Sequence, residues 1–196
     1  MTASSLLPTA HGARRRYLAL WLPYLPAERH MRISGARDEP LVLTQKSANA
    51  VRLAAVSRIA ASMGLAPGLT LADARARIPN LIAAEAAPDS DSHMLSRLAT
   101  WCDRFTPLVA MDGHDGLLLD VTGCVGLFGG EAGLRNATIM GMKRLGFSVK
   151  ASLAGTPDAA SALARFGSTA IVPEGDDARA TSGLPLVALM AGEEAT

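Results

Sequence analysis

Cysteine is scarce in this sequence, and no C-x-x-C pair is present. Cys102 and Cys124 stand alone, and neither has a histidine at the spacing of zinc ligands. We therefore expect neither a disulfide framework nor a zinc site, and both thiols are expected to be reduced in a bacterial-type cytosol.

Long apolar runs are also missing. Arg14, Arg15 and Arg16 precede the segment "YLALWLPYLP" in the manner of a signal peptide, but Pro23 and Pro26 interrupt it. No apolar run approaches the roughly 18 residues that a membrane helix needs, so we expect a cytoplasmic protein without membrane contact.

An excess of charge of one sign is absent as well. The chain has 19 Lys and Arg against 18 Asp and Glu, a net charge of +1. This balance neither requires a nucleic-acid partner nor excludes a local basic face. With 196 residues, 49% of them hydrophobic, the chain is long enough for one sizeable core or two small ones.

Residues 27–85 predict a small α/β subdomain. Residues 1–13 lack periodicity and are expected to form a disordered tail. Within 27–85, "PAERHMRI" is typical of a helix, and "PLVLTQ" and "NAVRLA" are typical of short strands. Two further helices follow: "AVSRIAASMG" ends at Gly64, and "LADARARI" begins at the capping pair Thr70 and Asp73.

With that block set aside, the order is strand, helix, strand, strand, helix, strand. The predicted ranges are 17–23, 91–105, 107–111, 116–121, 130–145 and 147–153. This is the ferredoxin-like pattern, an α/β fold of the α+β type with a subdomain inserted after its first strand. We expect the four strands in one sheet and both helices on one of its faces.

The segment "HDGLLLDVTGC" places Asp115 and Asp120 at the ends of an apolar strand. Turn chemistry alone would also select Asp112 and Asp115 around Gly113, and Asp120 suits a turn or cap. His114, in the same turn, is expected to be exposed. A metal site and a structural hairpin are both open at this point.

Longer motifs point to a family. The run "WCDRFTPLVAMDGHDGLLLDVTGC", preceded by "SMGLAPGLTLADARARIP", resembles the Y-family lesion-bypass DNA polymerases, which carry "ARxxGVxxGM" in the fingers and "SIDEAYLDVT" in the palm. Within that superfamily, "DGLLLDVTGCVGLFGGE" and "AGTPDAASALARFG" are most similar to polymerase-like subunits of bacterial mutasomes. The resemblance implies a palm formed by 14–26 and 86–170, fingers formed by 27–85, and the start of a thumb or linker over 171–196.

The resemblance also implies that the catalytic carboxylates are lost. The palm motif places Asp115 on the family's aspartate but Gly116 on its glutamate. The first-strand aspartate falls at Pro23 or a neighbour, and no acid precedes Glu28. Two of three carboxylates are absent, so neither a bound metal nor another cofactor is expected.

The resemblance implies that the residues that bind the nucleotide are lost as well. The family's fingers Tyr-x-x-Arg aligns with Arg58 and Ala61, and its triphosphate-binding lysine falls near Ala162. Arg29 and Arg32, together with the DNA-backbone candidates Arg52, Arg58, Arg75 and Arg77, cluster in the fingers-like block. They are expected either to contact a phosphate backbone weakly and without sequence preference, or simply to be solvated.

The resemblance implies a non-catalytic adaptor in DNA-damage-induced mutagenesis. Its expected partners are an accessory subunit of the ImuA type, an error-prone C-family DNA polymerase and the sliding clamp. The only glutamine, Gln45, lacks the neighbours of a clamp-binding "QLxLF" peptide, so that contact is expected outside this chain. The alternatives are an active lesion-bypass polymerase with relocated ligands and a ferredoxin-like binding module unrelated to DNA.

Overall fold

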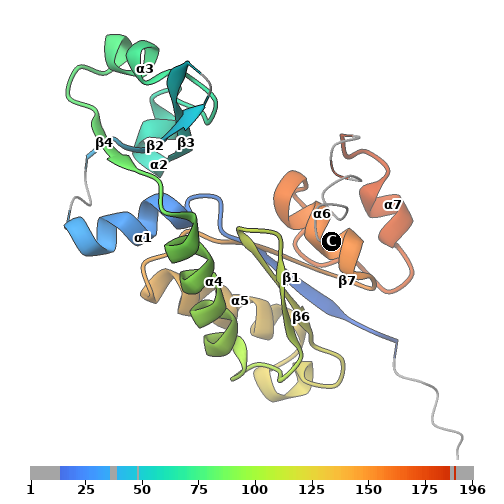
Figure 1. The fold of residues 1–196 in the computed structure, drawn as a ribbon. Helices are drawn as coiled ribbons and strands as arrows, with labels where there is room; N and C mark the ends of the chain where they lie inside the picture. Colours follow the sequence, from blue (N-terminus) through green and yellow to red (C-terminus); the bar gives the residue numbers. More distant parts are fainter. Residues whose placement is uncertain (1–13, 36–38, 48, 186–187, 189–196) are drawn as a thin grey trace, which may run out of the picture.

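Two β-sheets organise the part of the chain that the structure describes. A computed structural model describes residues 14–35, 39–47, 49–185 and 188. The larger sheet has the strand order β5-β6-β1-β7 and the smaller one the order β3-β2-β4. Figure 1 shows the smaller sheet, with its own helices, set apart from the larger one. No helix within these residues is long and apolar enough to span a bilayer.

The larger sheet confirms the predicted ferredoxin-like order. It consists of β1 (Tyr17–Trp21), β5 (Val109–Asp112), β6 (Gly116–Asp120) and β7 (Lys150–Ala154), and neighbouring strands are antiparallel. Helix α4 (Pro88–Cys102) precedes β5, and α5 (Glu131–Arg144) precedes β7. A short 3-10 helix, η1 (Val125–Phe128), lies between β6 and α5.

One face of the larger sheet carries the main core. Strand side chains alternate between faces, so Leu18 and Leu20 of β1 point toward α4 and α5 and are fully buried there. Leu95 of α4 and Leu134 of α5 meet them, which confirms that both helices cover one face. Each fully buried leucine contributes about 1.5–3 kcal/mol to stability.

The opposite face is covered by α6 (Pro157–Phe166), with α7 (Asp177–Thr181) beside it. Thr156 caps α6 by accepting the N–H of Ala159, and Pro157 occupies its first turn. The contact surface is mostly alanine, so α6 packs close to the sheet. Its polar side chains thereby reach the β5–β6 hairpin.

The smaller sheet consists of β2 (Leu41–Ser47), β3 (Ala50–Val56) and β4 (Ile82–Glu85). Helices α2 (Arg58–Ser62) and α3 (Leu71–Arg77) contribute to a separate core. Thr70 caps α3 by accepting the N–H of Asp73, as predicted. Strand β4 was not predicted, because "IAAE" has a weak strand propensity and its parallel pairing with β2 is a long-range contact.

Helix α1 (Leu25–Ser34) connects β1 to the smaller sheet. Its buried Ala27 packs beside Leu41 and Leu43 of β2, while Arg29 forms an ion pair with Asp91 of α4. The domain boundaries expected at 26/27, 85/86 and 170/171 stay predictions. The expected tail at 1–13 lies outside the described residues, as do 186–187 and 189–196 of the expected thumb region.

Candidate functional site

Asp115 lies in the turn between β5 and β6, at one end of the larger sheet. Its carboxylate is mostly buried, with 19% of the side chain exposed. Asp115 Oδ2 accepts the indole N–H of Trp21 over 2.8 Å, and Oδ1 accepts Nη1–H of Arg165 over 2.6 Å. Residues from β1 and α6 therefore converge on the aspartate that the sequence motif assigns to the family's palm aspartate.

Trp21 is the first-strand residue that faces this aspartate. It pairs in register with Gly116 of β6 and with Lys150 of β7. The ammonium of Lys150 lies 5.1 Å from the centroid of the Trp21 ring, within the range of a cation–π contact. Pro23 lies in a turn beyond the end of β1. A neighbour of Pro23, and not Pro23 itself, thus stands beside Asp115.

Gly116 has no room for a side chain. A Cβ atom built there would lie 2.6 Å from the backbone oxygen of Asp112 and 2.7 Å from Nη2 of Arg165. Both separations are shorter than ordinary contacts, and the first involves the backbone. A glutamate at 116 would therefore require the hairpin to shift and Arg165 to leave.

Arg165 binds two aspartates at once. Besides Asp115, its Nη2 donates to the backbone oxygen of Asp112 over 2.8 Å and to its Oδ2 over 3.2 Å. Ser161, one helical turn earlier on α6, donates its hydroxyl to the same Oδ2. The arginine side chain is only 11% exposed, so this ion pair is well shielded from water.

These residues do not fit the pair of divalent metals that the polymerase resemblance implies. Such metals need several oxygen ligands from neighbouring strands. Trp21 is a hydrogen-bond donor only, Gly116 has no side chain, and both aspartates are bonded to Arg165. In the described part of the chain, no group of three or more His, Cys, Asp or Glu could hold a metal ion.

The other candidates in the segment "HDGLLLDVTGC" are Asp120 and His114, and both lie at turns. Asp120 Oδ1 accepts the N–H of Thr122 over 3.0 Å, an Asx-type turn contact at the end of β6. His114 is exposed in the turn. Of the positions aligned with the nucleotide pocket, Ala61 packs against the smaller core and Ala162 is 7% exposed within α6. Their assignment as former triphosphate contacts stays a prediction.

The DNA-backbone candidates lie on different elements. Arg52 is on β3, where it donates to the backbone oxygen of Gly68, and Arg75 and Arg77 are on α3. Arg58 begins α2. All four are exposed, and their role at a phosphate backbone stays a prediction.

Arg58 lines a hollow that the sequence did not predict. It has a volume of about 610 Å³ and lies between α1, the start of α2 and the segment that joins α5 to β7. Arg32, Lys143 and Arg144 add three more cations to the lining of this hollow. Glu28 also lines it, and its carboxylate accepts the N–H of Ser148. Basic residues in the last turn of α5 were visible in the sequence, but helix ends commonly carry them for dipole reasons alone.

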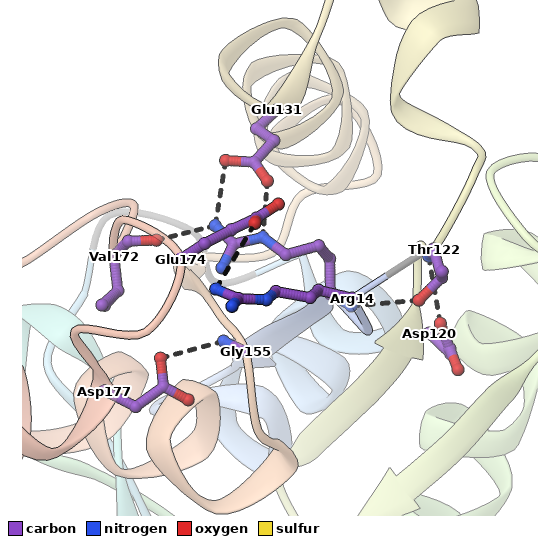
Figure 2. A network of polar contacts seen from close by, with 9 residues as sticks. Arg14, Asp120, Thr122, Glu131, Gly155, Val172, Glu174 and Asp177 are labelled. Atoms are coloured by element: carbon purple, nitrogen blue, oxygen red, sulfur yellow. Dashed lines mark hydrogen bonds and ion pairs between the residues drawn. The ribbon is translucent and has the colours of Figure 1, made fainter. Parts of the chain in front are cut away.

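Figure 2 shows a second polar network, at the other end of β1, that sequence reasoning also missed. The buried guanidinium of Arg16 donates to both carboxylate oxygens of Glu131 over 2.5 and 3.0 Å and to the backbone oxygen of Val172 over 2.7 Å. Asp177 accepts the N–H of Gly155 over 3.0 Å. These bonds fasten the segment that follows α6 to the larger sheet and α5.

Comparison with known proteins places this geometry in a family. The family model for IMS, the impB/mucB/samB family, matches residues 24–165. Protein ImuB of Caulobacter vibrioides strain NA1000 / CB15N is 46% identical over 134 residues, which are 68% of this chain and 29% of that protein. Protein ImuB of strain ATCC 19089 / CIP 103742 / CB 15 gives the same values. The aligned region thus spans less than a third of these relatives.

Solved structures share the fold. The insertion ternary complex of Dbh DNA polymerase matches with a TM-score of 0.71 and 16% identity, over 88% of this chain and 55% of that one. DinB from Sulfolobus solfataricus matches with a TM-score of 0.66 and 15% identity, over 82% and 49% of the two chains. These matches confirm the predicted Y-family polymerase palm and fingers fold. The chain belongs to the impB/mucB/samB family, and it is a Y-family polymerase-like domain similar to ImuB.

Proposed function

We propose that the protein containing this chain is a non-catalytic, polymerase-like subunit in translesion DNA synthesis. The observation that carries the proposal is the Arg165 guanidinium bound to Asp112 and Asp115, with Trp21 beside them on the first strand. Nucleotidyl transfer of this kind needs two metals to activate the attacking hydroxyl and to stabilise the leaving group. The residues present supply a cation of their own and too few ligands for two metals.

The role that follows is that of an adaptor. The similarity to ImuB supports an assembly in which the protein brings together an accessory subunit of the ImuA type, an error-prone C-family DNA polymerase and the sliding clamp. Such an assembly would act after DNA damage, at the nucleoid in the cytoplasm. Gln45 is the only glutamine, so a "QLxLF"-type clamp contact belongs to a region outside this chain.

A weak, sequence-independent contact with DNA is part of the proposal. Arg32, Arg58, Lys143 and Arg144 surround one hollow, and none of them forms an ion pair with a described carboxylate. Cations without an acidic partner are free to neutralise phosphates and release counterions. Arg52, Arg75 and Arg77 add positive charge on β3 and α3.

Reconstitution tests the adaptor role. The full-length protein is mixed with the purified accessory subunit, C-family polymerase and clamp encoded by the same genome. Size-exclusion chromatography with light scattering then measures the mass of the assembly. We expect a complex of defined mass that includes the C-family polymerase. If the full-length protein stays separate from every one of these proteins, the adaptor role is wrong.

A further inference from the structure

We propose that Arg165 is the resident counter-ion of this palm and excludes divalent metal from Asp112 and Asp115. The inference rests on the non-catalytic character proposed above, and it goes further by naming the group that closes the site. An arginine guanidinium stays charged in proteins, so Arg165 meets both carboxylates as a cation. The loss of metal chemistry would then be an active exclusion in addition to a loss of ligands.

The hydrogen bonds of the cluster support this exclusion. Arg165 holds Oδ1 of Asp115 and Oδ2 of Asp112, and it also holds the backbone oxygen of Asp112. The second oxygen of Asp115 accepts the N–H of Trp21, and Oδ2 of Asp112 also accepts the hydroxyl of Ser161. A metal ion would have to displace protein donors from both carboxylates, and its charge would be repelled by the guanidinium.

A side chain at position 116 and the guanidinium of Arg165 would occupy the same space. The nearest side-chain atom to a Cβ at position 116 is Nη2 of Arg165, at 2.7 Å. Glycine at this position is therefore what allows the guanidinium to reach Asp112. A glutamate at position 116 would therefore conflict with Arg165 as well as with the backbone oxygen of Asp112.

The position of Arg165 on α6 makes the exchange possible. Ala159, Ala160, Leu163 and Ala164 hold the helix close to the sheet, and Ser161 and Arg165 lie one turn apart toward the hairpin. The alanine-rich contact brings a long side chain within reach of Asp115, which is 50 residues away in sequence. The hairpin and the helix are thus joined by a cation that belongs to the chain itself.

Manganese binding tests the inference. Full-length wild type, Arg165→Met, Arg165→Lys and the triple variant Arg165→Met with Asp112→Asn and Asp115→Asn are titrated with Mn²⁺, and free Mn²⁺ is measured by electron paramagnetic resonance. We expect Arg165→Met to bind one Mn²⁺ at least about tenfold more tightly than wild type, and its thermal midpoint to rise with Mn²⁺. The triple variant should lose this binding, and Arg165→Lys, which keeps the positive charge without the two-pronged guanidinium, should bind Mn²⁺ less tightly than Arg165→Met.

Two results would overturn the inference. One is a folded Arg165→Met that binds Mn²⁺ no more tightly than wild type. Circular dichroism checks that this variant is folded, and Arg165→Gln replaces it in the titration if it is not. The other is wild-type Mn²⁺ binding that Asp112→Asn removes. Primer extension with the same proteins separates the two claims, because Mn²⁺ binding by wild type without nucleotide incorporation would contradict the exclusion but not the non-catalytic role.

Discussion

Trp21 and Gly116 face each other in register on the antiparallel strands β1 and β6. One presents a donor-only indole to Asp115, and the other presents a bare backbone to Arg165. Polymerase chemistry on this fold needs acceptor oxygens from the two neighbouring strands. The pair therefore puts a hydrogen-bond donor and a bare backbone at the end of the sheet where that chemistry needs acceptor oxygens.

Gly116→Ala should destabilise the protein by about 1–3 kcal/mol, because a methyl group at this site collides with the backbone of Asp112 and with Arg165. Gly126→Ala is the matched control, since nothing lies within 4 Å of a Cβ at that glycine, and its effect should stay within about 0.5 kcal/mol. Urea denaturation of both variants measures the difference. Equal stabilities would mean that position 116 is not crowded.

Arg29→Met should cost about 3–5 kcal/mol, because it leaves Asp91 without its partner in a pair whose side chains are only 7% and 13% exposed. The control is Glu174→Gln, which breaks an ion pair with Arg14 whose side chains are 58% and 71% exposed. That change should cost less than about 1 kcal/mol. Thermal unfolding compares the two variants, and a small effect of Arg29→Met would show that α1 and α4 are not held by this pair.

Cys102 should resist thiol reagents in the native protein. Burial raises the pKa of its thiol to about 12, with Asp103 acting in the same direction, so at pH 8 only about one molecule in 10⁴ carries the reactive thiolate. Half-buried Cys124 should react with a disulfide reagent first. Cys102 should follow only when urea unfolds the chain. Two thiols that react at the same native rate would contradict the packing of α4.

The basic hollow should contribute to DNA affinity. Arg58→Ala combined with Lys143→Ala should weaken binding to single-stranded DNA of any sequence. It should also make the negative slope of log K against log salt shallower by about 0.7 for each phosphate that is no longer neutralised. Arg97→Ala, which removes an exposed arginine from α4 away from the hollow, is the control. Fluorescence anisotropy at several salt concentrations measures the slopes. An unchanged slope in the double variant would place the DNA-binding cations elsewhere.

Local signals predicted most of the fold. The cap at Thr70 and the apolar runs that form β1 and β6 depend on neighbours in sequence, and the structure confirms them. Strand β4 escaped prediction because "IAAE" becomes a strand only by pairing with β2. Signals from residues that are neighbours in the sequence do not reveal that long-range contact.

The site was predicted less completely than the fold. The motif placed Asp115 and Gly116 at the end of the sheet. Arg165 lies on a helix, and helical spacing in a sequence does not reveal which residues of the sheet a side chain of that helix contacts. The choice between Pro23 and its neighbours also depended on strand register, and the register places Trp21 opposite Gly116. Register is set by the packing of whole strands, which no single motif reveals.

A glutamate introduced at position 116 should not produce polymerase activity. Gly116→Glu places an acid beside Asp115 only by displacing Arg165, and it still lacks a partner at Trp21. Catalytic groups that act together are strongly non-additive, and about 1.4 kcal/mol corresponds to a factor of ten in rate. Rapid-quench assays of this variant, in the full-length protein, should therefore show no nucleotide incorporation above that of a heat-inactivated sample.

Primer extension by the full-length wild-type protein tests the central claim most directly. The assay uses undamaged and abasic templates with Mg²⁺ or Mn²⁺, and Asp115→Ala serves as the control. We predict no nucleotide incorporation with either metal on either template, because Arg165 and Trp21 occupy the carboxylate and leave no site for two metals. Incorporation by the wild type that Asp115→Ala abolishes would show an active polymerase and would contradict the account.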